Sequence, residues 1–514
     1  MLQISHLTLT HKKDLRVILK EFNIVLNRGD KAVIIGEEGN GKSTLLKWIY
    51  DPALVSDYIE AEGERSCQGE KLGYLPQELP AEHKKLTVYK YFSAWDGFWD
   101  QTPADLKRMA ARLHLPSELF YSDQKMGTLS GGEKVKLQMA RLLMEQPDIL
   151  LLDEPSNDID IETLEWMEAL IRESGQTVLF ISHDETLIEK TANRVILLEQ
   201  LRRKTVSRYT VANLPFSQFM EERAAAFDKQ AQLAQSEQRE ERKALEKFRS
   251  IQQSVEHAQN SVSRQDPHGG RMLKKKMASV KAMGKRFERE HAERTQEPEY
   301  ETSISIRFDR QRPMPAGKIV LDHEWSELRR PNDGAILARK IHLVVKGPEK
   351  ICIIGKNGAG KTTLLRKIKD LLLSRADLHA GYMPQEYGEL LELDRSPVEI
   401  LAPDGSKESV TKVRTLLGSM KYTADEMNHP IRELSGGQKA KVLLLRMSLQ
   451  ETDVLILDEP TRNFSPLSGP EIRRLLRTFP GAIVSISHDR KYIDEVCDKV
   501  YRLTENGLRL ERQN

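Results

Sequence analysis

The sequence predicts an α/β fold in which two related domains are joined by a long antiparallel α-helical hairpin. Five sequence blocks occur twice in the same order, and each apolar run ends in a glycine loop or a carboxylate before helical periodicity begins. This pattern is typical of parallel sheets covered by helices. Between the copies lies a polar segment rich in Glu, Gln, Lys and Arg. A chain of 514 residues has room for such an arrangement.

The repeated blocks delimit the domains. The pairs, first copy before second, are VIIGEEGNGKSTLL (33–46) and IIGKNGAGKTTLL (353–365), LGYLPQE (72–78) and AGYMPQE (380–386), LSGGEKVKLQMARLL (129–143) and LSGGQKAKVLLLRMSL (434–449), DILLLDEPS (148–156) and DVLILDEPT (453–461), VLFISHD (178–184) and IVSISHD (483–489). We expect a first domain at 1–209, a linker at 210–300 and a second domain at 301–514.

Composition excludes several classes of protein. The net charge of +2 rules out a polycation, so any nucleic-acid contact must be local. Cys67, Cys352 and Cys497 form no CxxC pair, which argues against a zinc cluster. The first residues show no signal-peptide pattern, and no apolar run reaches the roughly 18 residues of a membrane span. We expect a cytoplasmic protein without a membrane partner.

Both copies contain the GxxxxGK[ST] pattern of a phosphate-binding loop. Its glycines let backbone N–H groups face a phosphate, and the following helix adds its positive N-terminus. The lysine would reach the β- and γ-phosphates, and the hydroxyl after it would bind Mg²⁺. One such loop could be a chance glycine turn, but two after apolar strands make that reading negligible. The expected ATP contacts are Gly36, Gly39, Gly41, Lys42, Ser43 and Thr44 in the first copy, and Gly355, Asn357, Gly358, Gly360, Lys361, Thr362 and Thr363 in the second.

The first loop contains an unusual pair of carboxylates, Glu37 and Glu38. If their side chains point outward, they cost little. If they do not, we expect the first site to bind ATP more weakly than the second.

The carboxylate blocks predict hydrolysis. Asp153 and Asp458 end apolar strands and would hold Mg²⁺. The catalytic candidates that follow would orient the attacking water or contact the γ-phosphate, and they are Glu154, Glu459, His183 and His488. Gln77 and Gln385 would sense Mg²⁺ and γ-phosphate. A lone His or Gln is usually an ordinary polar loop residue, but its place in a duplicated series of motifs reverses that preference. The expected metal set is Ser43, Gln77 and Asp153 in one site, and Thr362, Gln385 and Asp458 in the other.

LSGGE at 129–133 and LSGGQ at 434–438 resemble the signature motif of the ATP-binding-cassette superfamily. The resemblance covers about 1–205 and 317–512. It implies that the signature of each domain binds the γ-phosphate held by the other, so ATP joins the domains and hydrolysis releases them. The group Ser130, Gly131 and Gly132 would complete the Lys361 site. The group Ser435, Gly436 and Gly437 would complete the Lys42 site.

The linker sequence predicts two helices, each with a single apolar stripe, separated by a cluster of helix-breaking residues. Apolar residues from Leu245 to Val262 step by three or four, as do those from Leu273 to Phe287, and Gln265-Asp266-Pro267-His268-Gly269-Gly270 lies between them. A helix of about 30 residues would extend ~45–50 Å. We expect the hairpin tip at about 263–276.

The expected tip is basic. Residues 264–286 include eight basic residues and only one acidic residue, Asp266. A charge run is usually a solvated face, but such an imbalance in a neutral protein favours contact with a phosphate backbone. The expected ribosome or tRNA contacts are Arg264, His268, Arg271, Met272, Lys274, Lys275 and Lys276.

Tandem domains with a charged helical linker resemble the ABC-F family of translation factors. The resemblance implies that the linker enters the exit-tRNA site of the ribosome and contacts the peptidyl tRNA, while a short insertion in the first domain contacts the ribosome nearby. The candidate insertion is about 83–102, which contains the aromatics Tyr89, Tyr91, Phe92, Trp95, Phe98 and Trp99. A locally packed helical cap is an equal alternative for it.

The second copy departs from the first after its catalytic glutamate, where Ser465 replaces the acid of the D-loop. This departure resembles the Lsa-type and Vga-type antibiotic-resistance members, which dislodge lincosamides, pleuromutilins and streptogramin A from the peptidyl-transferase centre. We therefore expect a monomeric ATPase, with ATP and Mg²⁺ as cofactors, whose partners are rRNA and peptidyl tRNA. A general translation or rescue factor is the first alternative. Three other functions fit the linker and the two glutamates less well: the motor of an importer, a non-hydrolysing scaffold and a DNA-repair ATPase.

We expect the double substitution Glu154→Gln and Glu459→Gln to abolish ATP hydrolysis while ATP still binds, because removing a positioned catalytic carboxylate commonly costs ~10²–10⁴ in rate. Phosphate release and nucleotide binding, measured on the same preparation, check this. Full turnover in the double variant would contradict the catalytic assignment.

Overall fold

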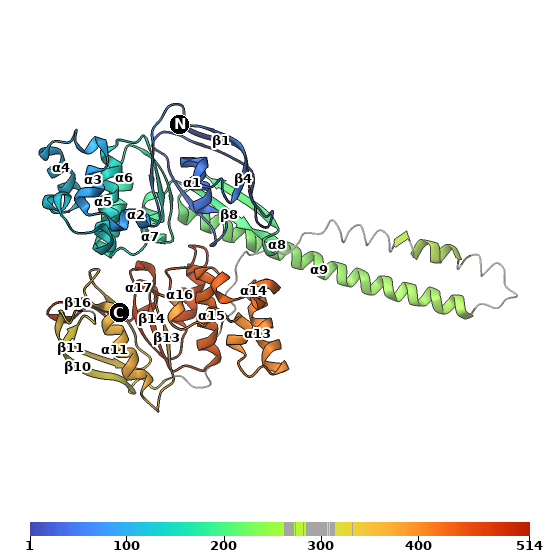
Figure 1. Cartoon of the computed structure of the whole chain (residues 1–514). Coiled ribbons are helices and arrows are strands. Elements are labelled where there is room, and N and C mark those ends of the chain that lie inside the picture. Colours follow the sequence, from blue (N-terminus) through green and yellow to red (C-terminus); the bar gives the residue numbers. More distant parts are fainter. Residues whose placement is uncertain are drawn as a thin grey trace. The chain divides into compact units, whose positions relative to one another are not determined.

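The computed structural model describes residues 1–261, 272, 274–280, 282–283, 306, 308, 314–331 and 333–513. The chain forms two compact units (Figure 1). The larger comprises Met1–Phe216 and Glu301–Asn514, and thus both copies of the repeated domain. The smaller comprises Ser217–Tyr300.

The first domain is built on a six-stranded sheet whose strand order is β5-β6-β7-β3-β8-β9. Its strands are β5 (Leu72–Leu75), β6 (Ile149–Asp153), β7 (Thr177–Ile181), β3 (Lys31–Ile35), β8 (Arg194–Gln200) and β9 (Val206–Ala212). The first five pair in parallel and only β9 is antiparallel. Helix α1 (Lys42–Tyr50) follows β3, and α5 (Gly131–Met144) precedes β6. Helices α6 (Ile161–Glu173) and α7 (Glu185–Thr191) follow β6 and β7. Every residue of β3, β6 and β7 is buried, as expected for central parallel strands.

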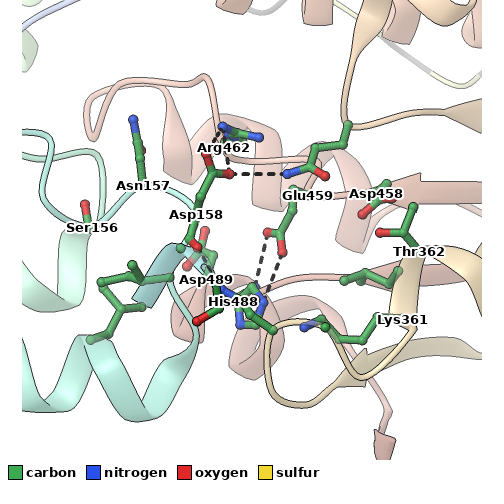
Figure 2. A pocket seen from close by; sticks show the side chains of 18 of the residues that line it. Ser156, Asn157, Asp158, Lys361, Thr362, Asp458, Glu459, Arg462, His488 and Asp489 are labelled. Carbon is green, nitrogen blue, oxygen red and sulfur yellow. Dashed lines mark hydrogen bonds and ion pairs between the residues drawn. The ribbon is translucent and has the colours of Figure 1, made fainter. Parts of the chain in front are cut away.

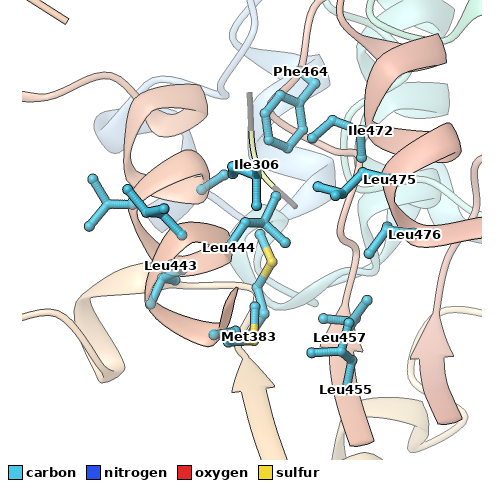
Figure 3. Close-up of a cluster of buried hydrophobic side chains, with 14 of the residues drawn as sticks. Ile306, Met383, Leu443, Leu444, Leu455, Leu457, Phe464, Ile472, Leu475 and Leu476 are labelled. Carbon is cyan, nitrogen blue, oxygen red and sulfur yellow. The ribbon is translucent and has the colours of Figure 1, made fainter. Parts of the chain in front are cut away.

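The second domain repeats this topology with the order β13-β14-β15-β12-β16-β17. The strands are β13 (Ala380–Met383), β14 (Val454–Asp458), β15 (Ala482–Ile486), β12 (Lys350–Ile354), β16 (Lys499–Thr504) and β17 (Gly507–Gln513). The helices are α11 (Lys361–Leu373), α12 (Pro397–Leu401), α13 (Lys407–Ser419), α14 (Ala424–Asn428), α15 (Gly436–Leu449), α16 (Gly469–Arg477) and α17 (Arg490–Val496). Leu443 and Leu444 of α15 belong to the same buried cluster as Leu457 of β14 (Figure 3). The predicted fold class is confirmed.

Two antiparallel sheets were not predicted. The first domain adds β1 (Leu2–His11), β2 (Val17–Leu26) and β4 (Ile59–Ser66), and the second adds β10 (Ile319–Arg329) and β11 (Ile336–Lys346). The inward-facing side chains of the first sheet, Phe22 among them, share a core with α1, and those of the second sheet, Trp325 among them, share a core with α11. These strands carry no motif, so only their weak alternation of apolar and polar residues signalled them.

The candidate insertion at 83–102 is a short helical segment. It begins within α2 (Ala81–Lys85) and contains α3 (Val88–Ser93) and a 3₁₀ turn. The other helices of the first domain are α4 (Pro103–Leu113) and α8 (Leu201–Lys204). Tyr91, Phe92 and Phe98 are buried, and the Phe92 ring lies 4.9 Å from the Phe120 ring. Trp99 is 65% exposed. Half of the six aromatics therefore serve local packing, and Trp99 is left at the surface.

The smaller unit is helical where the structure describes it. Helix α9 (Phe216–Ser261) has 46 residues, which corresponds to ~69 Å at ~1.5 Å per residue. Residues 274–280 are also helical. Val255 and Val280 are buried, whereas Lys274, Lys275 and Lys276 are exposed. The predicted helix breakers, and with them Arg264, His268 and Arg271, lie outside the described residues. Across the part of the chain that is described, no helix is long and apolar enough to cross a membrane.

Within the larger unit, α7 of the first domain meets α16 and α17 of the second through buried ion pairs. The Arg473 guanidinium is 4% exposed and donates to both oxygens of Glu185, at 2.6 and 3.2 Å. Lys491 lies 3.2 Å from Glu185, and Arg490 pairs with Asp184 at 3.2 Å. Directly after the shared Ser-His-Asp sequence, the first copy has the acid Glu185, whereas the second has the bases Arg490 and Lys491. The two copies have thus diverged into oppositely charged partners.

We expect Arg473→Ala to destabilise the packing of these helices by about 3 kcal/mol, because buried Glu185 would lose the guanidinium that donates to both of its oxygens and would keep only Lys491. Amide hydrogen exchange in α7, α16 and α17 reports the loss as local opening. Arg108→Ala, which breaks an exposed pair with Asp105, is the matched control and should cost less than about 1 kcal/mol. Unchanged exchange in all three helices would show that the buried pair does not hold the domains.

Candidate nucleotide sites

The loop between β12 and α11 is shaped to receive an anion. Gly355, Gly358 and Gly360 have φ of 150°, 83° and 95°, a region that favours glycine. A Cβ on Gly355 would lie 2.8 Å from the Leu503 carbonyl oxygen. The Lys361 ammonium folds over the loop and donates to the Gly355 carbonyl at 2.7 Å and to the Lys356 carbonyl at 3.1 Å. Backbone amides, the N-terminus of α11 and this ammonium together make a phosphate cradle.

A cavity of about 820 Å³ opens beside this loop (Figure 2). Both domains line it, and the side chains and backbone groups that bear on nucleotide chemistry are Lys361, Thr362, Thr363, Gln385, Asp458, Glu459 and His488 from the second domain, and Ser130, Gly131, Lys134 and Asp158 from the first. The signature of the first domain therefore faces the phosphate loop of the second, which is the cross-pairing that the resemblance implies.

Each signature serine begins a helix. Ser130 caps α5 and Ser435 caps α15, and each hydroxyl accepts the N–H of the residue three positions later. The N–H groups of the intervening glycines have no acceptor within their own helix. They are the groups that an anion from the opposite domain would satisfy.

The strand-end aspartates fit a divalent cation. Asp458 is buried, its Oδ2 has no hydrogen-bond partner among the described residues, and Thr362 donates to the same carboxylate. Burial raises the pKa of Asp458 to about 6. In the first domain Ser43 Oγ donates to Asp153 Oδ1 at 2.8 Å. A carboxylate beside a hydroxyl supplies oxygen ligands that suit Mg²⁺. The positive charge of the cation would offset the cost of burying the carboxylate.

The two glutamate–histidine pairs differ. His183 has its Nε2 3.2 Å from Glu154 Oε1 and its Nδ1 2.9 Å from the Phe464 carbonyl oxygen, so both ring nitrogens face acceptors. Burial alone would raise the pKa of Glu154, but the bond to His183 and its charge lower it to about 2. Burial lowers the pKa of His183, but the hydrogen bond to Glu154 and the charge of that carboxylate raise it above its ordinary value, which favours a ring that donates from both nitrogens.

In the second domain the corresponding contact is looser. His488 Nε2 lies 3.7 Å from Glu459 Oε1, and the buried Nδ1 has no partner among the residues the structure describes. Burial, followed by the charge of Lys361, lowers the pKa of His488 to about 3. Burial and the neighbouring Asp458 raise the pKa of Glu459. This pair faces the cavity, where a nucleotide and its cation would supply the missing charges.

The first site has the same loop but different contents. Gly39 and Gly41 have φ of 80° and 85°, and Lys42 Nζ donates to the Gly36 carbonyl at 2.8 Å. Thr44 follows Ser43 in the first turn of α1, and Gln77 Nε2 donates to Glu154 Oε2 at 2.9 Å.

Glu37 and Glu38 do not point into solvent. They reach the second domain, where the Gly437 N–H donates to Glu38 Oε2 at 3.0 Å and Ser468 Oγ donates to Glu37 Oε1 at 2.8 Å. Of the two alternatives that the sequence left open, the outward orientation is wrong.

Sequence reasoning missed Arg462 and Asp158. The Arg462 guanidinium lies 2.8 Å from the Asp158 carboxylate (Figure 2), and Gln385 Nε2 donates to the same group at 3.3 Å. Asn357 Nδ2 donates to the Asp158 carbonyl at 2.7 Å. One signal was present, because Arg462 occupies the position of Asn157 in the first copy.

We expect Arg462→Met to weaken ATP binding at the Lys361 loop by roughly fivefold, because Asp158 would then face the phosphates without its counter-charge, and a partly exposed ion pair contributes about 1 kcal/mol or less. Adding Asp158→Asn should restore most of the affinity. Titration of the single and double variants checks this, and an additive loss in the double variant would contradict the pairing.

Comparison with known proteins agrees with this geometry. The family model described as "ABC transporter" matches residues 19–157 and 338–462, slightly more than half of the chain. "Ribosome protection protein VmlR" of Bacillus subtilis is 28% identical over 96% of this chain and 85% of its own length. "ABC transporter F family member 5" of Arabidopsis thaliana is 24% identical over 96% of this chain and 73% of its own. An archaeal ribosome recycling factor, aABCE1, solved with a ribosomal stalk protein, has a TM-score of 0.60 at 17% identity over 98% of this chain and 89% of its own, which shows the fold. The chain belongs to the ABC transporter family and is an ABC-F-type ATPase with two ATP-binding cassettes.

Proposed function

We propose that this ATPase is a cytoplasmic ribosome-protection factor. It binds the ribosome near the exit-tRNA site with ATP and Mg²⁺ bound. Its linker contacts rRNA and the peptidyl tRNA, disfavours the drug-bound state of the peptidyl-transferase centre, and leaves after hydrolysis. The observation that carries the proposal is the combination of two cassettes in one chain with a 46-residue helix that leads to exposed lysines. The similarity to a protein named for ribosome protection supports it.

The nucleotide chemistry follows from the second site. The phosphates of ATP would lie between the N-terminus of α11 and the first turn of α5, so bound ATP joins the cassettes. Mg²⁺ would be held by Asp458 and Thr362, with Gln385 nearby. Glu459 would orient the attacking water, and His488 would contact the γ-phosphate. Loss of the γ-phosphate removes the anion that bridges the two helices, so the cassettes separate.

The linker supplies the contact with nucleic acid. Lys274, Lys275 and Lys276 lie side by side on a helical segment with their side chains exposed, and Met272 beside them is 53% exposed. Three adjacent ammonium groups favour a phosphate backbone, and an exposed thioether favours an apolar or aromatic surface such as a base. Displacing a drug needs no pump, because binding that prefers the drug-free ribosome shifts the equilibrium by itself.

Ser465 favours the resistance branch over a general translation factor. In the housekeeping members that the sequence resembles, an acid stands at this position of the D-loop. Here the hydroxyl donates to Glu37 across the cassette interface. A general translation or rescue factor remains the second candidate, supported by the similarity to an F-family member of a plant.

We expect expression of this chain in a sensitive bacterium to raise tolerance to lincosamides, pleuromutilins or streptogramin A without lowering drug uptake. Minimum inhibitory concentrations measure this.

Replacing Lys274, Lys275 and Lys276 with Gln should weaken ribosome binding and reduce the logarithmic salt slope by roughly 0.7–0.9 for each phosphate that the chain no longer neutralises. A salt titration of ribosome co-sedimentation measures the slope.

The matched control replaces three exposed lysines of α9, Lys229, Lys243 and Lys247, with Gln. It removes the same charge from the same unit and should leave the slope unchanged. Equal slopes for the two triple variants would mean that the 274–276 run is only a solvated face. Ribosome binding without protection against any of the three drug classes would favour the general translation factor.

A further inference from the structure

The first phosphate loop differs from the second at the two positions after its first glycine. The second loop has Lys356 and Asn357 there, whereas the first has Glu37 and Glu38. Two carboxylates beside a nucleotide's phosphates repel them, so they require compensation from the protein. The groups that compensate these two carboxylates belong to the second cassette.

Glu38 occupies the anion position of the opposite signature. Gly437 is the second residue of α15, and the Ser435 hydroxyl that caps this helix accepts the Gln438 N–H instead. The Gly437 N–H is left for an external acceptor, and it donates to Glu38 Oε2 at 3.0 Å. A Cβ on Gly436 would lie 3.2 Å from Glu38 Oε1, so the carboxylate lies against both glycines. A carboxylate at this helix N-terminus makes the contact that a phosphate oxygen would make.

Glu37 makes a second contact across the interface. It accepts from Ser468 at 2.8 Å and from Ser465, both in the loop after the catalytic glutamate of the second cassette. Burial would raise the pKa of Glu37, but the charge of Lys441 and these hydroxyls hold it below the ordinary value. In the other half of the molecule the acid stands on the opposite side, because Asp160 accepts from the Asn357 N–H at 3.4 Å. At the Lys361 site the phosphate loop donates and Asp160 of the other cassette accepts. At the Lys42 site the phosphate loop carries the acid, Glu37, and Ser465 of the other cassette donates to it. This exchange accounts for serine at position 465.

The Lys361 site differs at this point, because among the described residues no carboxylate accepts from the Gly132 N–H, which corresponds to that of Gly437. The signature there lines the cavity of about 820 Å³ beside Lys361. A γ-phosphate has room to reach this signature, whereas at the Lys42 site it would compete with Glu38 for the same amide.

We propose that the Lys42 site is selective for nucleoside diphosphates, with the Glu38 carboxylate in the place of a γ-phosphate. The diphosphate occupies the loop, Glu38 joins that loop to the opposite signature, and this half of the interface closes without a triphosphate. Hydrolytic turnover then belongs to the Lys361 site. The inference rests on the proposed function only in requiring that the Lys42 loop binds a nucleotide.

The test isolates the first site in the full-length chain with Lys361→Ala. ADP and the non-hydrolysable triphosphate β,γ-imido-ATP, each with Mg²⁺, are titrated by calorimetry. We expect ADP to bind at least about tenfold more tightly than the triphosphate, since one like charge a few ångströms away at an effective dielectric near 20 is worth more than a factor of ten. Glu38→Gln, which keeps the shape and removes the charge, and Glu38→Ala, which removes both, should each bring the ratio close to that of the Lys42→Ala chain.

Glu62→Gln, an exposed carboxylate on β4, is the matched control and should leave the ratio unchanged. Equal affinity for the two nucleotides in the Lys361→Ala chain, or a ratio that neither Glu38 variant alters, would overturn the inference. So would a Lys361→Ala chain that binds neither nucleotide. Failure of the Lys42→Ala chain to bind the triphosphate would instead contradict the ATP site on which the proposed function depends.

Discussion

The first turns of α5 and α15 expose N–H groups that no acceptor within their own helices can satisfy, and the interface of the two cassettes is arranged around the anions that satisfy them. Each helix points these groups at the phosphate loop of the other cassette. A bound phosphate at such a place is worth far more than a surface contact because amide dipoles converge on it from a partly buried position. An anion supplied by a nucleotide or by the protein itself would therefore stabilise the contact between the two domains at these helix ends.

The buried ion pairs between α7 and α16–α17 have a different role. They do not depend on nucleotide, because both charges belong to the chain. Arg473 is nearly inaccessible and has two carboxylate partners, so separation of the helices would leave several charges without compensation. Under the proposed function, this contact would hold the cassettes in register when the signatures separate from the phosphate loops.

The two copies have diverged most where they touch. The first cassette presents acids after its histidine and in its phosphate loop, and the second presents bases and hydroxyls opposite them. In an interface between identical domains, residues on the two-fold axis would face their own copies, so like charges would meet there. The equivalent helices α7 and α17 contact each other in this way. Divergence removes that repulsion and makes the two nucleotide sites chemically unequal. The paired Glu154–His183 and the looser Glu459–His488 are one expression of this, and the Arg462–Asp158 pair is another.

The sequence by itself determined the two cassettes, their parallel sheets and the residues that form each phosphate loop, because these motifs are local. A glycine loop, a strand-end carboxylate and a helix cap each work within a few residues of one another. It also indicated the long helix of the linker, whose apolar seam is a periodic signal. The antiparallel sheets escaped, since their strands pair with segments distant in the chain and carry no motif. Only the tertiary structure decided where Glu37 and Glu38 point and what Arg462 contacts. Their partners lie more than 300 residues away in sequence, and such pairings are set by how two folded surfaces meet, which no local pattern of residues records.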